Sequence, residues 1–145
     1  MEFKLFRDKR GYSMTFWAVF IGFVMVPTMA MAIEVGRFFF TRSQIAASAD
    51  ASALAAAVEI NQRQFISSGA LAFTSQTYAW AQKAVDINCE KLITLGVHPH
   101  VSNITIQGNT VNVEVSADLS LLFPAILPDI TVAEWGMAEV RALRR

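Results

Sequence analysis

The chain has no Asp, Glu, Lys or Arg between Gly11 and Ile33. As a helix this stretch is roughly 35 Å long at about 1.5 Å per residue, whereas the hydrocarbon core of a bilayer is about 30 Å thick. Tyr12 and Trp17 near its start are typical of the aromatic belt at a membrane interface, and Pro27 predicts a kink. The stretch therefore predicts a transmembrane helix over residues 12–33.

Basic side chains are more frequent before this span than after it. Segment 1–11 contains Lys4, Arg7, Lys9 and Arg10, whereas the first twenty residues after the span contain Arg37 and Arg42. Because positively charged flanks stay in the cytoplasm, we expect a cytoplasmic N-terminus and a C-terminal part on the other side.

The same N-terminus also fits a cleaved secretory signal. The tripeptide at residues 30–32, Ala-Met-Ala, is a small-x-small cleavage site, and cleavage after Ala32 would give a secreted protein. The apolar core of such signals is about 7–15 residues, shorter than the span found here. Length therefore favours an uncleaved anchor.

Composition limits what the rest of the chain can be. With 54% hydrophobic and 17% charged residues, the 145-residue chain fits one membrane segment plus a small domain. The formal net charge is zero and no basic block occurs, so we expect no nucleic-acid partner. The single cysteine, Cys89, rules out an intramolecular disulfide.

An alanine-rich helix is predicted directly after the span. Residues 33–62 contain no proline and one glycine, and the helix-forming residues predict a stalk over residues 34–66. Glu34 and Arg37 are spaced to pair on one helix face. A stripe of small residues suits close packing either against another helix or against the chain's own domain; it comprises Ala46, Ala49, Ala53, Ala56 or Ala57, and Ile60.

The remaining residues, 67–145, predict a small α+β domain. An amphipathic helix is expected within residues 71–95, with an apolar stripe of Tyr78, Ala81, Val85, Cys89 and Leu92. A hairpin follows, turning at Gly108-Asn109 and pairing Gln107 with Thr110, Ile106 with Val111, Ile104 with Val113 and Ser102 with Val115.

A last strand is expected over Ile130–Ala142, with a bulge near residues 133–136, because its apolar residues change parity there. The preceding connection is unusually apolar for a loop. It either covers the open end of a small sheet or forms a surface for a partner or the bilayer; its candidate residues are Leu121, Leu122, Phe123, Ile126 and Leu127.

Residues that carry chemistry are scarce. His98 and His100 would need Cys89 or Glu90 to make even a partial metal site, and two ligands do not close one. Cys89 lies on the apolar stripe of its helix, which favours a buried hydrophobe over a reactive thiol. No phosphate loop or nucleophile motif occurs. We therefore expect no enzyme, no metal and no cofactor.

Ordered motifs across residues 8–59 resemble the N-terminal segment of the TadE/TadG-like family of Flp (Tad) pilus assembly proteins. That family combines a basic segment ending in glycine, an uncharged span, an acid followed by Gly-Arg, and an alanine-rich helix with one acid. The matching residues here are Gly11, Glu34, Gly36, Arg37, Asp50, Ala51, Ala53, Leu54 and Ala55. Phe16 stands where members processed after the glycine carry a glutamate, so we expect Gly11 to remain uncleaved.

The resemblance implies a structural function. It implies a minor-pilin-like or assembly component of an Flp-type pilus or a related secretion machine, held in the bacterial inner membrane with its domain in the periplasm or outside the cell. Its implied partners are the membrane, other pilus subunits, the inner-membrane platform and further copies of itself. A membrane-anchored periplasmic binding or sensor module is the alternative, and it would need a concave polar site in the distal domain.

Overall fold

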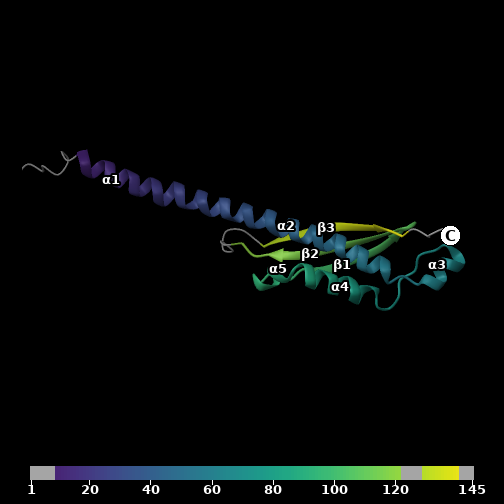
Figure 1. Ribbon diagram of the computed structural model, residues 1–145. Helices are drawn as coiled ribbons and strands as arrows, with labels where there is room; N and C mark the ends of the chain where they lie inside the picture. Colours follow the sequence, from purple (N-terminus) through teal and green to yellow (C-terminus); the bar gives the residue numbers. More distant parts are fainter. Residues whose placement is uncertain (1–8, 122–128, 141–145) are drawn as a thin grey trace, which may run out of the picture. The chain divides into compact units, whose positions relative to one another are not determined.

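The computed structural model describes residues 9–121 and 129–140. The chain divides into two compact units, residues 1–37 and residues 38–145. The first unit is helical, and the second combines helices with an antiparallel sheet, so the expected α+β class with a long apolar N-terminal helix is confirmed. Figure 1 labels the elements along the chain.

The first unit consists of α1 (Lys9–Phe20), the π-helical segment η2 (Ile21–Met25) and the beginning of α2 (Val26–Val58). The widened turn has a local cause, because Pro27 has no N–H to offer the preceding turn. The amide of Val26 bonds to the carbonyl of Ile21, and Thr28 Oγ1 donates to Val24 O at 2.7 Å. The backbone groups near the proline are thus partly re-satisfied within the helix, as a lipid environment requires.

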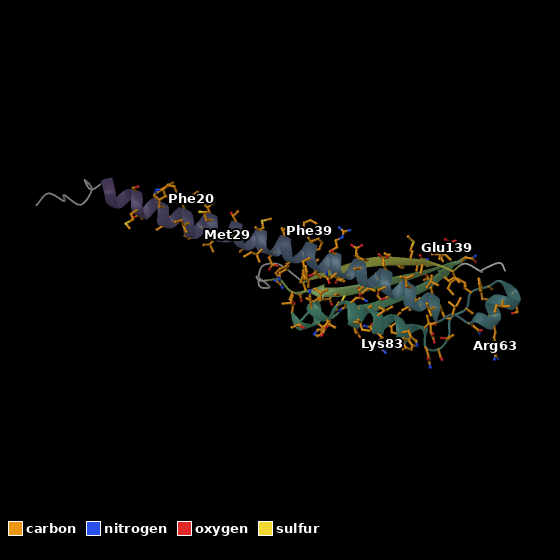
Figure 2. The ribbon with its side chains drawn as sticks, viewed as in Figure 1. Phe20, Met29, Phe39, Arg63, Lys83 and Glu139 are labelled. Atoms are coloured by element: carbon orange, nitrogen blue, oxygen red, sulfur yellow. The ribbon has the colours of Figure 1, made fainter. Side chains whose placement is uncertain are left out.

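Side chains of the uncharged segment are open to their surroundings. Phe23 is 81% exposed and Met29 62% exposed, and every residue from 13 to 29 is exposed. Figure 2 shows Phe20 and Met29 projecting outward from the helix. A face this apolar is stable only when lipid or another apolar surface covers it.

The sheet of the second unit has the order β1-β2-β3, formed by β1 (His100–Gln107), β2 (Thr110–Leu119) and β3 (Ile130–Glu139). The hairpin turns at Gly108, whose φ of 60° suits the first central position of a type II′ turn. Three of the predicted pairs are confirmed: Gln107 with Thr110, Ile106 with Val111, and Ile104 with Val113. The fourth is wrong, because a bulge at Ser102 pairs Val101 with Val115 instead.

Helices α2 and α4 (Thr77–Asn88) supply the residues that cover one face of this sheet (Figure 1). Alternate residues of β2 are fully or almost fully buried beneath them: Val111, Val113, Val115, Ala117 and Leu119. The predicted apolar stripe is buried at Ala81 and Val85 on α4 and continues to the buried Cys89 and Leu92. Its first member, Tyr78, is not part of the core and is 53% exposed. The opposite sheet face leaves Trp135 52% exposed and Met137 71% exposed.

The alanine stripe of α2 packs on the chain's own sheet. Ala49, Ala53 and Ala56 have no exposed surface and belong to the hydrophobic core, and Ala46 is half-buried. The sequence left open whether this stripe packs against another helix or against the chain's own domain, and it packs against the chain's own domain. Because these side chains are small, the helix backbone approaches the sheet closely: a Cβ on Gly136 would lie 2.1 Å from the carbonyl oxygen of Ala49.

Several expected boundaries are corrected. Residues 38–58 belong to the folded second unit, so the segment taken as a stalk over 34–66 contributes directly to the core. Helix α2 ends at Val58, where the chain turns back. Ile60 forms an antiparallel β-bridge with Phe73, and the backbone N–H of Asn61 donates to Ala72 O at 2.9 Å. Asn61 then caps α3 (Gln62–Ser68).

Two further elements differ from expectation. The helix expected within residues 71–95 is two helices, α4 and α5 (Glu90–Thr94), which meet at Cys89. Strand β3 ends at Glu139 and pairs regularly with β2 throughout, so the expected bulge near residues 133–136 is wrong. The change of parity arises because Trp135 and Met137 point away from the core while Gly136 lies beneath α2.

Candidate functional site

The motif residues at the start of α2 form a local ion pair. Arg37 Nη1 lies 3.2 Å from Glu34 Oε2 and 3.4 Å from Glu34 Oε1, one helical turn apart, which confirms the predicted pairing. Gly36 is exposed, and a Cβ there would meet nothing within 4 Å. The backbone of Gly11 lies in α1. The pair neutralises two charges next to the uncharged span, where an isolated charge is costly.

The second part of the motif has two faces on α2. Ala53 is buried in the core, whereas Asp50 is exposed and Leu54 is 62% exposed. Ala51 and Ala55 are half-buried at the boundary between these faces. The acid and the leucine therefore lie outside the hydrophobic core.

An outward stripe on α2 surrounds these two exposed residues. It repeats at spacings of three and four, so its members lie on one face of the helix, opposite the buried alanines. We define the outward stripe as Phe40, Ser43, Ala47, Asp50, Leu54 and Val58, all of which are exposed. It combines large apolar groups with small residues and one carboxylate, a composition suited to contact with another helix.

Polar contacts fix α2 against its neighbours. Arg42 pairs with Glu134 on β3, and the side chain of Glu134 is 23% exposed. Ser52 Oγ lies 2.7 Å from Ser48 O and 3.2 Å from Ala81 O on α4. These contacts give the helix a defined rotation, which determines which residues form the outward stripe.

Cys89 is a buried residue of the core. Its side chain has no exposed surface, and its Sγ lies 3.9 Å from Gln44 O. Burial raises the pKa of the Cys89 thiol, with a smaller contribution from the nearby Asp86 carboxylate and an opposing one from a hydrogen bond with Ser48. A thiol held neutral in this way is a poor nucleophile.

The histidines lie apart from a metal-binding arrangement. His98 and His100 are exposed, and His100 Nε2 lies 3.3 Å from Ser116 Oγ. Within residues 9–121 and 129–140, no three His, Cys, Asp or Glu side chains are grouped so that they could hold a metal ion.

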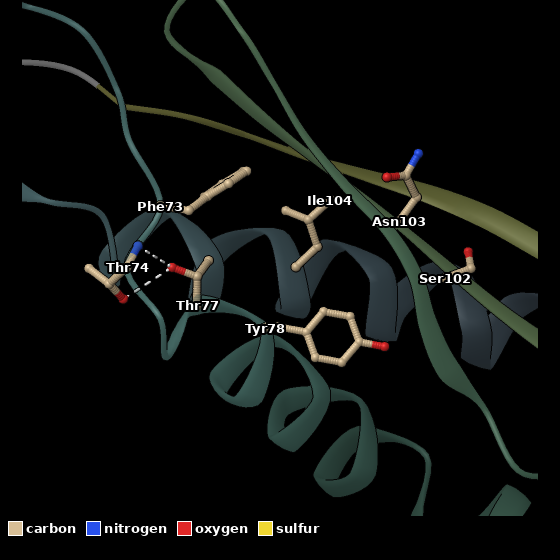
Figure 3. Close-up of a pocket in the computed structure, with 7 residues that line it drawn as sticks. All are labelled: Phe73, Thr74, Thr77, Tyr78, Ser102, Asn103 and Ile104. Atoms are coloured by element: carbon tan, nitrogen blue, oxygen red, sulfur yellow. Dashed lines mark hydrogen bonds between the residues drawn. The ribbon is translucent and has the colours of Figure 1, made fainter.

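An open pocket of about 360 Å³ lies beside β1 (Figure 3). Figure 3 shows Phe73, Tyr78 and Ile104 around it, coming from the loop before α4, from α4 and from β1. The hydroxyls of Thr74 and Thr77 bond to each other at 3.2 Å and support the turn into α4. None of the described residues that line the pocket is charged. Sequence patterns do not predict the pocket, because its residues come from separate elements.

The apolar connection between β2 and β3 is the predicted partner surface, and the structure describes only its first residues. Leu121 is buried, with 9% of its surface exposed. Leu122, Phe123, Ile126 and Leu127 lie outside the described residues. The expected surface therefore stays a prediction.

Comparison with known proteins identifies the N-terminal segment. Residues 11–59 match the Tad family, described as "Putative Flp pilus-assembly TadE/G-like". Over these residues the chain is similar to that family. The match spans α1, η2 and α2, including the ion pair and the outward stripe. Neither the curated proteins nor the solved structures provide a further match.

The family match supports a broad function, and the long apolar helix bears on where the chain acts. The match supports a role related to Flp pilus assembly. Within the described part of the chain, one helix, Ser13–Val58, is long and apolar enough to cross a membrane, and with the family it supports membrane anchoring.

Proposed function

We propose that this protein is a minor-pilin-like or assembly component of an Flp-type pilus or related secretion machine. It is held uncleaved in the bacterial inner membrane, with its N-terminus in the cytoplasm and the α+β domain outside. The family match over residues 11–59 and the apolar helix beginning at Ser13 support this assignment. Its action is to hold and present a surface, not to carry out a reaction.

The outward stripe is the surface we assign to contact with other subunits. The observation that carries this assignment is the division of the alanine-rich motif: Ala53 is used by the chain's own core, whereas Asp50 and Leu54 are left outside it. An exposed apolar side chain beside a carboxylate favours a partner helix that offers an apolar surface and a cation or a hydrogen-bond donor.

A deletion strain tests the function. Surface fibres are counted by electron microscopy after deleting the gene, with the intact chain or a variant restored. We expect fibres to disappear and to return with the intact chain but not with one lacking residues 14–33. Unchanged fibre number, in a strain shown to make Flp-type pili, would refute the proposal.

A matched pair of substitutions tests the surface. Leu54→Asp charges the outward stripe, and Ile87→Asp makes the same change on α4, where Ile87 is 67% exposed. We expect Leu54→Asp to lower fibre number while Ile87→Asp does not, with both variants present at parental levels in the membrane. Equal fibre numbers for the two variants would contradict the assigned surface.

Fractionation tests the anchor separately. The intact mass of the protein in the membrane fraction should include the first 32 residues. A soluble product that begins after Ala32 would instead support the secreted alternative.

A further inference from the structure

Strand β1 is the outer strand on one side of the sheet, so one of its edges is free of a neighbouring strand. Gln107 and Thr110 flank a two-residue turn, so they form a hydrogen-bonded pair. Going back along β1 from Gln107, residues that hydrogen-bond to β2 alternate with residues that do not. Thr105 and Asn103 therefore bond to β2. Ile104 and Ile106 turn their N–H and C=O groups away from β2, toward the free edge.

The same alternation is visible at the other end of β1. After the bulge, Val101 faces the free edge, and side chains of α4 occupy both of its backbone groups. Gln82 Oε1 accepts from Val101 N at 2.9 Å, and Tyr78 OH donates to Val101 O at 2.5 Å. Gln82 Nε2 also lies 3.4 Å from Pro99 O. Helix α4 thus closes the first part of the edge.

The second part of the edge stays open. Within the described residues, no hydrogen bond reaches the outward N–H or C=O of Ile104 or Ile106. Residues 101–107 also carry no Lys, Glu, Asp, Arg or Pro, the residues with which edge strands discourage pairing. Four backbone groups are therefore available to another strand.

A pocket lies at the same place. Ile104 lines it together with Phe73 and Tyr78, which are 39% and 53% exposed (Figure 3). A strand paired with Ile104 would place one side chain beside it on the core face of the sheet, because directly opposite residues share a face. The 360 Å³ of open, uncharged space accommodates an aliphatic side chain there.

We propose that the free edge of β1 at Ile104–Ile106 binds an extended, uncharged strand of a different protein, whose apolar side chain enters the pocket of Phe73, Tyr78 and Ile104. The backbone groups supply recognition and the pocket supplies preference for one side chain. A second copy of the folded domain is a poorer occupant, because three edge residues and one pocket bury far less than the roughly 1,200 Å² of a stable interface. A flexible segment adapts to such a short edge.

Hydrogen exchange measured by NMR on the full chain in detergent tests this proposal. The probe is a synthetic heptapeptide of alternating threonine and isoleucine, and its control is the same peptide with alternate N-methyl groups that block one edge. At ten times its dissociation constant, we expect the unmethylated peptide to slow exchange of the Ile104 and Ile106 amides about tenfold. The Thr105 amide, already bonded to β2, serves as the internal reference.

Two variants connect the effect to the edge. Ile106→Pro removes an outward N–H without removing a bond to β2, whereas Ile106→Val keeps that N–H. We expect Ile106→Pro to abolish protection at Ile104 and Ile106→Val to retain it, with near-ultraviolet circular dichroism verifying that both are folded. If the proline variant is unfolded, the N-methylated peptide alone decides the result, because it leaves the protein unchanged.

Three results would overturn the proposal. Exchange at Ile104 could remain unchanged at millimolar peptide, or the N-methylated peptide could protect equally well. Protection could also be present without peptide and rise with protein concentration, which would make a second copy the occupant. No pilus component enters this experiment, so its outcome is independent of the proposed function.

Discussion

The close approach of α2 to β3 at Gly136 gives the sharpest prediction. A Cβ at this position would lie 2.1 Å from Ala49 O, 2.2 Å from Ala49 C and 2.5 Å from Asp50 N. Carbon atoms in favourable contact are about 3.5–4.0 Å apart, so Gly136→Ala requires the helix to withdraw by roughly 1 Å. Because the obstacle is backbone, rotation of a side chain cannot relieve it.

The cost follows from what this withdrawal loosens. Ala49, Ala53 and Ala56 are fully buried at this interface and would lose part of their packing. Overpacking of this kind costs about 1–3 kcal/mol, and a backbone obstacle favours the upper end of that range. For a folded unit the size of residues 38–145, a loss of about 3 kcal/mol in the free energy of unfolding lowers the melting temperature by roughly 12 °C or more.

The assay is thermal unfolding of the full chain in a mild detergent, followed by near-ultraviolet circular dichroism. The matched control is Gly36→Ala, because a Cβ there meets nothing within 4 Å and alanine favours the helix; we expect no loss of stability. Adding Ala49→Gly to Gly136→Ala should give no rescue, because the clash is with the Ala49 carbonyl. A melting temperature for Gly136→Ala within a few degrees of the parent would refute the proposed packing.

Four other predictions concern single side chains or single contacts. Cys89 should react with a thiol reagent at least 100-fold more slowly in the folded chain than after unfolding, and equal rates would contradict its burial. Burial raises the pKa of the Cys89 thiol in the folded state above its value in the unfolded state, which is about 8.5. The stability that the neutral thiol contributes is therefore fully present below the unfolded-state pKa and is lost as pH rises through the folded-state pKa. Melting temperatures should therefore fall with alkaline pH, less steeply in Cys89→Ala; identical slopes would argue against this linkage. Tyr78→Phe should lower the free energy of unfolding by about 1 kcal/mol, measured with denaturant, through loss of the bond to Val101 O, whereas no change would show that water replaces the hydroxyl without cost. A double-mutant cycle on Arg42 and Glu134 should give a coupling energy of no more than about 1 kcal/mol that weakens in high salt, because the Arg42 side chain is 55% exposed; a larger, salt-independent coupling would mean that the pair is effectively buried.

Local patterns predicted the parts of the fold that depend on neighbours in the sequence. The hairpin register around Gly108 followed from turn chemistry and alternation, and the pairing of Glu34 with Arg37 followed from helical spacing. The bulge at Ser102 was missed. It coincides with the place where α4 side chains bond to Val101, and those contacts come from a distant segment.

Long-range packing decided the elements that sequence patterns placed wrongly. No proline or glycine marks Val58 as the end of α2, and the helix stops where the chain returns to Phe73. The expected bulge in β3 was inferred from apolar parity. That parity misleads here because Gly136 faces α2 while the large side chains of Trp135 and Met137 face outward.

The sequence by itself determined the uncharged helix, the motif of the TadE/G-like segment and the hairpin, since each depends on residues within a few turns or one loop of each other. Only the tertiary structure decided which face of α2 is used internally. The alanines at 49, 53 and 56 are as suited to a partner helix as to a sheet, and periodicity cannot distinguish the two. The choice became fixed because Gly136 provides a place on β3 where the helix backbone can come into contact, leaving Asp50 and Leu54 on the outside.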